Sequence, residues 1–253
     1  MFPYPTTSRD ILRQDLAREF HLLGTMYTLT QHRMGILVQS DGTHEYATLK
    51  KLLQKTAFKI IAVQARCAEN LSYTGWEPNL SYVFPQKTYA ELLAAMSRYL
   101  LNPFPNPTLY WSDLTTSLFE LFVIQNDAIT RLEGRWLHDV ITSLGASFFQ
   151  TQRQLALNIL NILAGSLSLD TPLPPFLEVP RAVSFRLLLQ EKMPGELALE
   201  HVGENGYSVF AALAVSFRLA SRELRKCVEV VRALEGEVDL QWELDDEDFK
   251  KDV

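Results

Sequence analysis

The densest group of side chains able to bind a metal lies shortly before the last long apolar repeat. Glu196, Glu200 and Glu204 recur at steps of four, which puts them on one face if the segment is helical, and His201 lies among them. Carboxylates and imidazole bind divalent metals and exchange protons in acid–base catalysis. The dipole at a helix start also favours carboxylates, so a solvated acidic surface is the simpler interpretation.

The five histidines do not form the pattern of a di-iron helix bundle. That site uses Glu-x-x-His on two helices. The residues three positions before the histidines are instead Arg18, Leu29, Asp41, Arg135 and Ala198. The sequence also lacks a P-loop, Gly-x-Gly-x-x-Gly, Gly-x-Ser-x-Gly and Cys-x-x-Cys. We therefore expect no enzymatic activity, no bound metal and no cofactor.

The two cysteines, Cys67 and Cys227, are the remaining candidates for nucleophiles. Each lies on the apolar face of a predicted helix, where cysteine packs as a small hydrophobic residue. Two cysteines do not make a disulfide framework, and a reducing compartment is the simpler interpretation. We expect both side chains in the core.

A cluster of cations in the last predicted helix is a candidate docking face. It is formed by Arg218, Arg222, Arg225 and Lys226. Such a stripe could bind an anionic surface, either a membrane leaflet or the acidic end of the chain itself. Glu223 and Glu229 interrupt it, so an ordinary solvated helix face is the alternative.

Phenylalanines in two predicted helices could line an apolar cavity between them. The candidates are Phe148, Phe149, Phe210 and Phe217. Helix bundles can hold an apolar ligand in such a space. Close packing of the same side chains would leave no cavity.

The charge of the chain is unevenly distributed. The net charge is −6, and residues 239–253 contain seven acids and two lysines, which leaves the other 238 residues with a net charge of −1. Nucleic-acid binding needs a basic surface, so we expect no nucleic-acid partner. The acidic end also carries Leu240, Trp242 and Phe249, a composition found in docking segments and in frayed termini.

The sequence predicts no membrane-spanning helix. The first twenty residues contain no apolar run, as a signal peptide would require. The longest uncharged stretch, residues 154–169, has 16 residues and several polar ones, whereas a span needs about 20 apolar residues. The isolated chain is predicted to be soluble.

Apolar residues recur at steps of three and four along most of the chain, which predicts helices. We expect long helices over residues 8–38, 45–71 and 205–234, a shorter one over 87–101, and helical structure over 111–167 with a break near Gly134. Thr7 or Ser8 would cap the first helix, and Gly236 would end the last. The clearest repeat is Leu213, Phe217, Ala220, Leu224, Cys227, Val231 and Leu234.

These lengths predict an all-α fold, an elongated up-and-down bundle of about four long helices and one or two short ones. Proline-rich stretches at residues 102–107 and 172–180 would connect the helices. Residues 183–199 could form a short strand or an interrupted helix. We expect one bundle domain over residues 1–238 and an acidic tail over 239–253.

Four stretches together resemble a known family. They are FPYPTTSR, WEPNLSYVFPQKTYAELL, LDTPLPPFLEVP and LRKCVEVVRALEGEVDL. Their order and spacing are similar to the C-terminal soluble domain of fungal multi-pass membrane proteins, described as endoplasmic-reticulum transporters of the brefeldin A-sensitivity or aromatic-acid-exporter type. The resemblance covers nearly the whole chain before the acidic tail and carries over no catalytic residue.

The resemblance implies a domain on the cytosolic face of a membrane, of the endoplasmic reticulum or the plasma membrane, attached through a transmembrane region that this sequence lacks. Phe2 and Tyr4 would then lie where the last span ends. The expected role is regulation, assembly or partner docking, through contacts with the membrane region or with another protein, itself included. The alternative is a sensor domain that holds an apolar or aromatic ligand between helices.

Overall fold

The computed structural model describes residues 7–38, 43–74, 86–96, 118–131, 134–175, 177, 179, 203–204 and 206–238. Some helical side chains within these ranges are not described, among them those of residues 137–149. Over these ranges the chain is helical apart from short turns and one isolated bridge. The predicted all-α bundle is therefore confirmed.

Six helices are present in the described part of the chain. Four are long, with 29 to 36 residues, and two are short, with 11 and 14. Their bounds are α1 Ser8–Val38, α2 Thr43–Thr74, α3 Gln86–Met96, α4 Leu118–Arg131, α5 Gly134–Leu169 and α7 Tyr207–Glu235.

Three helix ends have local causes in the sequence. Thr7 and Asp10 form a reciprocal capping box at the start of α1, in which the amide of Asp10 donates to Thr7 Oγ1 and the amide of Thr7 donates to Asp10 Oδ2. Asp170 adopts a left-handed conformation after α5, and the amide of Thr171 then donates to the carbonyl of Ser166. Gly236, at φ 80°, ends α7 as predicted.

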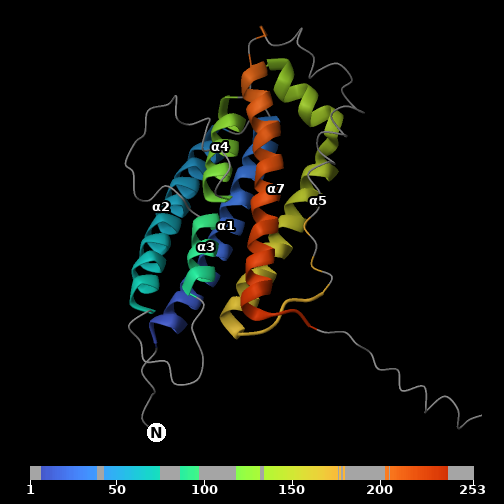
Figure 1. Cartoon of the computed structure of the whole chain (residues 1–253). Coiled ribbons are helices and arrows are strands. Elements are labelled where there is room, and N and C mark those ends of the chain that lie inside the picture. Colours follow the sequence, from blue (N-terminus) through green and yellow to red (C-terminus); the bar gives the residue numbers. More distant parts are fainter. Residues whose placement is uncertain are drawn as a thin grey trace, which may run out of the picture.

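The bundle is organised around α1 (Figure 1). Helices α2 and α5 both pack along α1, and α7 covers α3, α4 and part of α5. Late residues of α2 and the ends of α5 and α7 contact early residues of α1. These three helices therefore all run opposite to α1. Gly24 lets α1 and α5 approach closely, since a Cβ there would lie 3.2 Å from Leu157 Cδ2.

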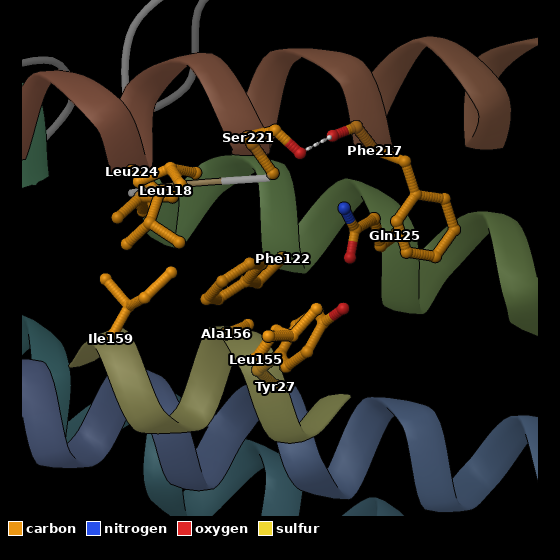
Figure 2. A pocket seen from close by; sticks show the side chains of 12 residues that line it. Tyr27, Leu118, Phe122, Gln125, Leu155, Ala156, Ile159, Phe217, Ser221 and Leu224 are labelled. Carbon is orange, nitrogen blue, oxygen red and sulfur yellow. Dashed lines mark hydrogen bonds between the residues drawn. The ribbon is translucent and has the colours of Figure 1, made fainter. Parts of the chain in front are cut away.

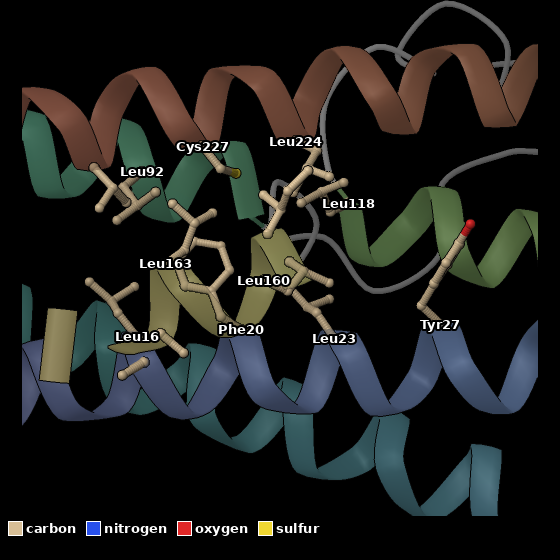
Figure 3. Packing of buried hydrophobic residues seen from close by; sticks show 14 of the residues in the cluster. Leu16, Phe20, Leu23, Tyr27, Leu92, Leu118, Leu160, Leu163, Leu224 and Cys227 are labelled. Atoms are coloured by element: carbon tan, nitrogen blue, oxygen red, sulfur yellow. The ribbon is translucent and has the colours of Figure 1, made fainter. Parts of the chain in front are cut away.

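A continuous hydrophobic core fills the space between α1, α5 and α7 (Figure 3). Phe20 of α1 is completely buried, and so are Leu160 and Leu163 of α5. Short helices supply Leu92 and Leu118 from the other sides. Burial of each such leucine or phenylalanine contributes about 1.5–3 kcal/mol, so this core is the main source of stability.

The ends of α1, α5 and α7 are tied together. Arg13 of α1 forms ion pairs with Asp170, just after α5, and with Glu235, in the last turn of α7. The Arg13 guanidinium lowers the pKa of the exposed Asp170, whereas burial raises the pKa of Glu235. A parallel bridge joins Leu173 to Glu237, with the amide of Leu173 3.0 Å from the carbonyl of Gly236.

The predicted apolar repeats of α2 and α7 face inward along their whole length. The α2 repeat is buried at Leu49, Leu53, Thr56, Ile60, Val63 and Cys67. The buried stripe of α5 runs through Ile159, Leu160, Leu163, Ala164 and Leu167, whereas Leu155, one turn earlier, is 37% exposed.

Several sequence predictions lie outside the described residues. They concern the connector at residues 102–107, the ambiguous segment 183–199, the acidic tail and the N-terminal aromatic residues Phe2 and Tyr4. No helix in the described part is both long and apolar enough to cross a membrane.

Two leucines of α5 test the assignment of the core. Leu163 is fully buried and Leu169 is 72% exposed. Leu163→Ala should lower the free energy of unfolding by about 2–5 kcal/mol, because it removes packed hydrocarbon and leaves a cavity. Leu169→Ala should change it by less than about 0.5 kcal/mol. Equal effects in chemical denaturation would contradict the packing described here.

Candidate functional site

The predicted acidic cluster lies mostly outside the described residues, which include Glu204 but neither Glu196, Glu200 nor His201. Within the described ranges, no three histidine, cysteine, aspartate or glutamate side chains are grouped so that they could hold a metal ion. The metal hypothesis therefore gains no support from the part of the cluster that is described.

The predicted docking face lies on α7, but part of its charge is used within the helix. Glu223, expected on the solvated side, is 1% exposed. Lys226 Nζ lies 3.0 Å from both Glu223 carboxylate oxygens, and Arg222 Nε lies 3.3 Å from one of them. Arg218 is exposed and Arg225 is half-buried. Two of the four cations thus neutralise a buried acid.

The two predicted cavity residues whose side chains are described, Phe210 and Phe217, do not gather at one place. Phe210 stacks on Trp136, with ring centroids 4.9 Å apart, and Tyr207 meets the edge of the same indole at 5.3 Å. Phe217, two turns further along α7, lines a cavity between helices. The side chains of Phe148 and Phe149 are outside the description.

The cavity at Phe217 lies between four helices and the segment after α5 (Figure 2). Most of its lining is hydrocarbon or aromatic, and the exceptions are Tyr27, Gln125 and Ser221. Its volume is about 50 Å³. The apolar lining is Leu118, Phe122, Leu155, Ala156, Ile159, Val179, Phe217, Ala220 and Leu224.

Gln125 is the unusual member of this lining. It lies on α4 and its side chain is completely buried. Neither Oε1 nor Nε2 has a hydrogen-bond partner among the described protein groups. Figure 2 shows its amide in the space between the rings of Phe122 and Phe217. A buried polar group left without a partner costs about 1–3 kcal/mol, so this amide needs an explanation.

The other two polar groups are less available to a ligand. Ser221 Oγ donates to the carbonyl of Phe217 at 3.1 Å. The ring of Tyr27 packs against Phe122 with centroids 4.9 Å apart, and burial raises the pKa of its hydroxyl. Tyr27 therefore stays neutral, and no side chain in the described lining of the cavity is charged near neutral pH.

A second buried polar group lies deeper in the bundle. Glu19 of α1 is 0% exposed, and its Oε1 accepts a hydrogen bond of 2.6 Å from Gln64 of α2. Its Oε2 has no partner in the described part of the chain. Burial raises the pKa of Glu19 to about 8, against a lowering effect of Gln64 and a further increase from Asp15.

Both cysteines are near this glutamate. Cys67 and Cys227 are free thiols with 0% exposure, as predicted for core residues. Burial raises the pKa of both thiols, and the charge of Glu19 contributes to both shifts. A thiol that stays protonated and inaccessible is a poor nucleophile. This geometry favours packing over catalysis at both positions.

A basic surface on α2 was not recognised from the sequence. Lys50, Lys51, Lys55 and Lys59 are all exposed on the side of α2 that faces away from α1. They form no ion pair within the described part of the chain. Phe58 is 72% exposed among them and Leu52 is 46% exposed. We call these six residues the α2 basic face; the run KKLLQKTAFK could have indicated it.

Comparison with family models, with curated proteins and with solved structures gives no match. The candidate sites therefore rest on geometry and chemistry alone.

The buried Glu19 predicts a pH dependence of stability. Its pKa of about 8 lies above its ordinary value of 4.5, so the folded state holds this proton more tightly than the unfolded state. The stabilisation of the folded state by this bound proton is fully present below the pKa that Glu19 has in the unfolded chain. It is lost as the pH rises through 8. Between about pH 5 and pH 9 the free energy of unfolding should fall by about 4 kcal/mol on this account.

Glu19→Gln should remove most of this fall, because glutamine stays neutral and can still bond to Gln64. Glu229→Gln, at an exposed position of α7, is the control with the same change of charge. Urea denaturation of the three proteins at both pH values measures the effect. If Glu19→Gln and wild type lose the same stability, Glu19 is ionised in the folded protein.

Proposed function

We propose that this chain is a non-catalytic helical docking domain of a membrane transporter, held on the cytosolic side of the membrane, and that the α2 basic face is its docking surface. The observation that carries the proposal is the combination of Phe58 and Leu52 with four lysines that form no ion pair in the described part of the chain, all of them exposed on α2. The resemblance in four sequence stretches supplies the membrane context.

The chemistry of this face favours anionic lipid headgroups as the surface that it binds. Lysines near a membrane surface contribute about 1 kcal/mol each when the leaflet is anionic. An aromatic side chain between them can enter the boundary between headgroups and acyl chains. The remainder of the chain outside the acidic end has almost no net charge, so the attraction is local to α2.

Flotation of the protein with vesicles tests this proposal. Wild type should bind vesicles of phosphatidylcholine that contain phosphatidylserine, and should bind pure phosphatidylcholine weakly. Lys55→Gln/Lys59→Gln should weaken binding about 30-fold at low salt, since two lysines contribute about 2 kcal/mol. Phe58→Ala should weaken it further.

Arg218→Gln/Arg225→Gln on α7 removes the same charge and leaves the partners of Glu223 in place. This matched control should bind like wild type. If only the α7 variant loses binding, the face predicted from the sequence is the docking surface. If neither wild type nor the chain without residues 239–253 binds either kind of vesicle, lipid docking is excluded. Binding that appears only when residues 239–253 are deleted would mean that the acidic tail covers the α2 basic face.

A second candidate function is the binding of a small molecule between helices. The cavity at Phe217 and Gln125 supports it. On the same volume measure, a cavity of about 150 Å³ in another protein accommodates benzene. The cavity of about 50 Å³ here is therefore too small for a whole aromatic ring unless its walls move.

A further inference from the structure

The unpaired amide of Gln125 gives the interhelical cavity a specific chemistry. The amide has one acceptor and two donor hydrogens, and none is used by a described protein group. Its side chain is completely buried and lies at the cavity wall. In a largely apolar cavity an occupant that satisfies this amide gains both hydrogen bonds and apolar contact.

The lining decides the charge of the occupant. Among the described residues, no arginine, lysine, aspartate or glutamate borders the cavity. An ion placed there would lose its hydration without meeting an opposite charge. The occupant is therefore neutral.

The geometry of the amide decides the functional group. Gln125 presents Oε1 and Nε2 side by side in one plane, so the best partner presents a donor beside an acceptor. A primary carboxamide does this and stays neutral at every physiological pH. A carboxylate can accept from Nε2 but cannot donate to Oε1, and it carries a charge. A ketone accepts only.

The volume decides how much of the occupant is enclosed. A cavity of about 150 Å³ holds the six carbon atoms of benzene, so a cavity of about 50 Å³ encloses about two or three non-hydrogen atoms. The carboxamide group itself has this size. Leu155 at the wall is 37% exposed and Phe217 is half-buried, so a larger body can extend outward past them.

We propose that this cavity is a binding site for the carboxamide end of a small neutral molecule with an aliphatic body, and that Gln125 pairs with that carboxamide through two hydrogen bonds. This inference rests on the second candidate function, small-molecule binding, and names its chemistry.

Titration of the ¹⁵N-labelled full chain with propionamide tests the proposal. The side-chain NH₂ signals of Gln125, identified by their loss in Gln125→Leu, should shift and saturate. Propionate and 2-butanone have the same number of non-hydrogen atoms and should bind at least about tenfold more weakly, a difference of about 1.4 kcal/mol.

Variants separate recognition from folding. Gln125→Leu should weaken propionamide binding at least about tenfold, and it should not lower the melting temperature, because it removes two unpaired polar atoms. Gln154→Leu, at an exposed position of α5, should change neither binding nor the signals of Gln125. Ala156→Leu fills the cavity from α5 and should abolish binding of all three probes.

The outcomes distinguish the two levels of the inference. If all three probes bind equally and Gln125→Leu binds them as wild type does, small-molecule binding stands and carboxamide recognition is overturned. If no probe binds, water alone satisfies Gln125. Carboxamide recognition and small-molecule binding, the second candidate function, are then both excluded. If Gln125→Leu unfolds, Ala156→Leu and the three-probe comparison still decide.

Discussion

The packing of α1 between two other long helices is the constraint on which the structure depends. Because α2 covers one side of α1 and α5 covers another, few positions of this helix are free to face solvent. Polar residues that a one-sided helix would expose are therefore enclosed, Glu19 and Thr30 among them. Gly24 brings α5 close enough to complete this enclosure.

The cavity is lined from α1 and from the helices around it. Tyr27 of α1 and Phe122 of α4 pack against each other at its wall, with ring centroids 4.9 Å apart. Gln125 lies one turn further along α4, where its buried amide faces the cavity. The exposure of the α2 basic face arises in the opposite way. Helix α2 packs mainly on α1, so its other side is left exposed with its lysines and Phe58.

Much of the fold could be predicted from the sequence, because long apolar repeats determine helices and their buried faces locally. The repeats of α2 and α7, the cap at Thr7 and the stop at Gly236 all follow from neighbouring residues. The burial of Glu19 and Glu223 does not, because it depends on which helices cover each face. Of the two predicted cavity residues whose side chains are described, Phe217 lies at the cavity and Phe210 does not. Gln125 gave no signal, since a glutamine within a helix ordinarily faces solvent.

The central claim is that helix packing leaves the amide of Gln125 without a hydrogen-bond partner among the described protein groups, at the wall of the interhelical cavity. A crystal structure of the chain soaked with propionamide measures this most directly. We expect the ligand between α4, α5 and α7, with its carboxamide oxygen and nitrogen within hydrogen-bonding distance of Gln125. A closed space in which Gln125 is hydrogen-bonded to a neighbouring protein group would contradict the account.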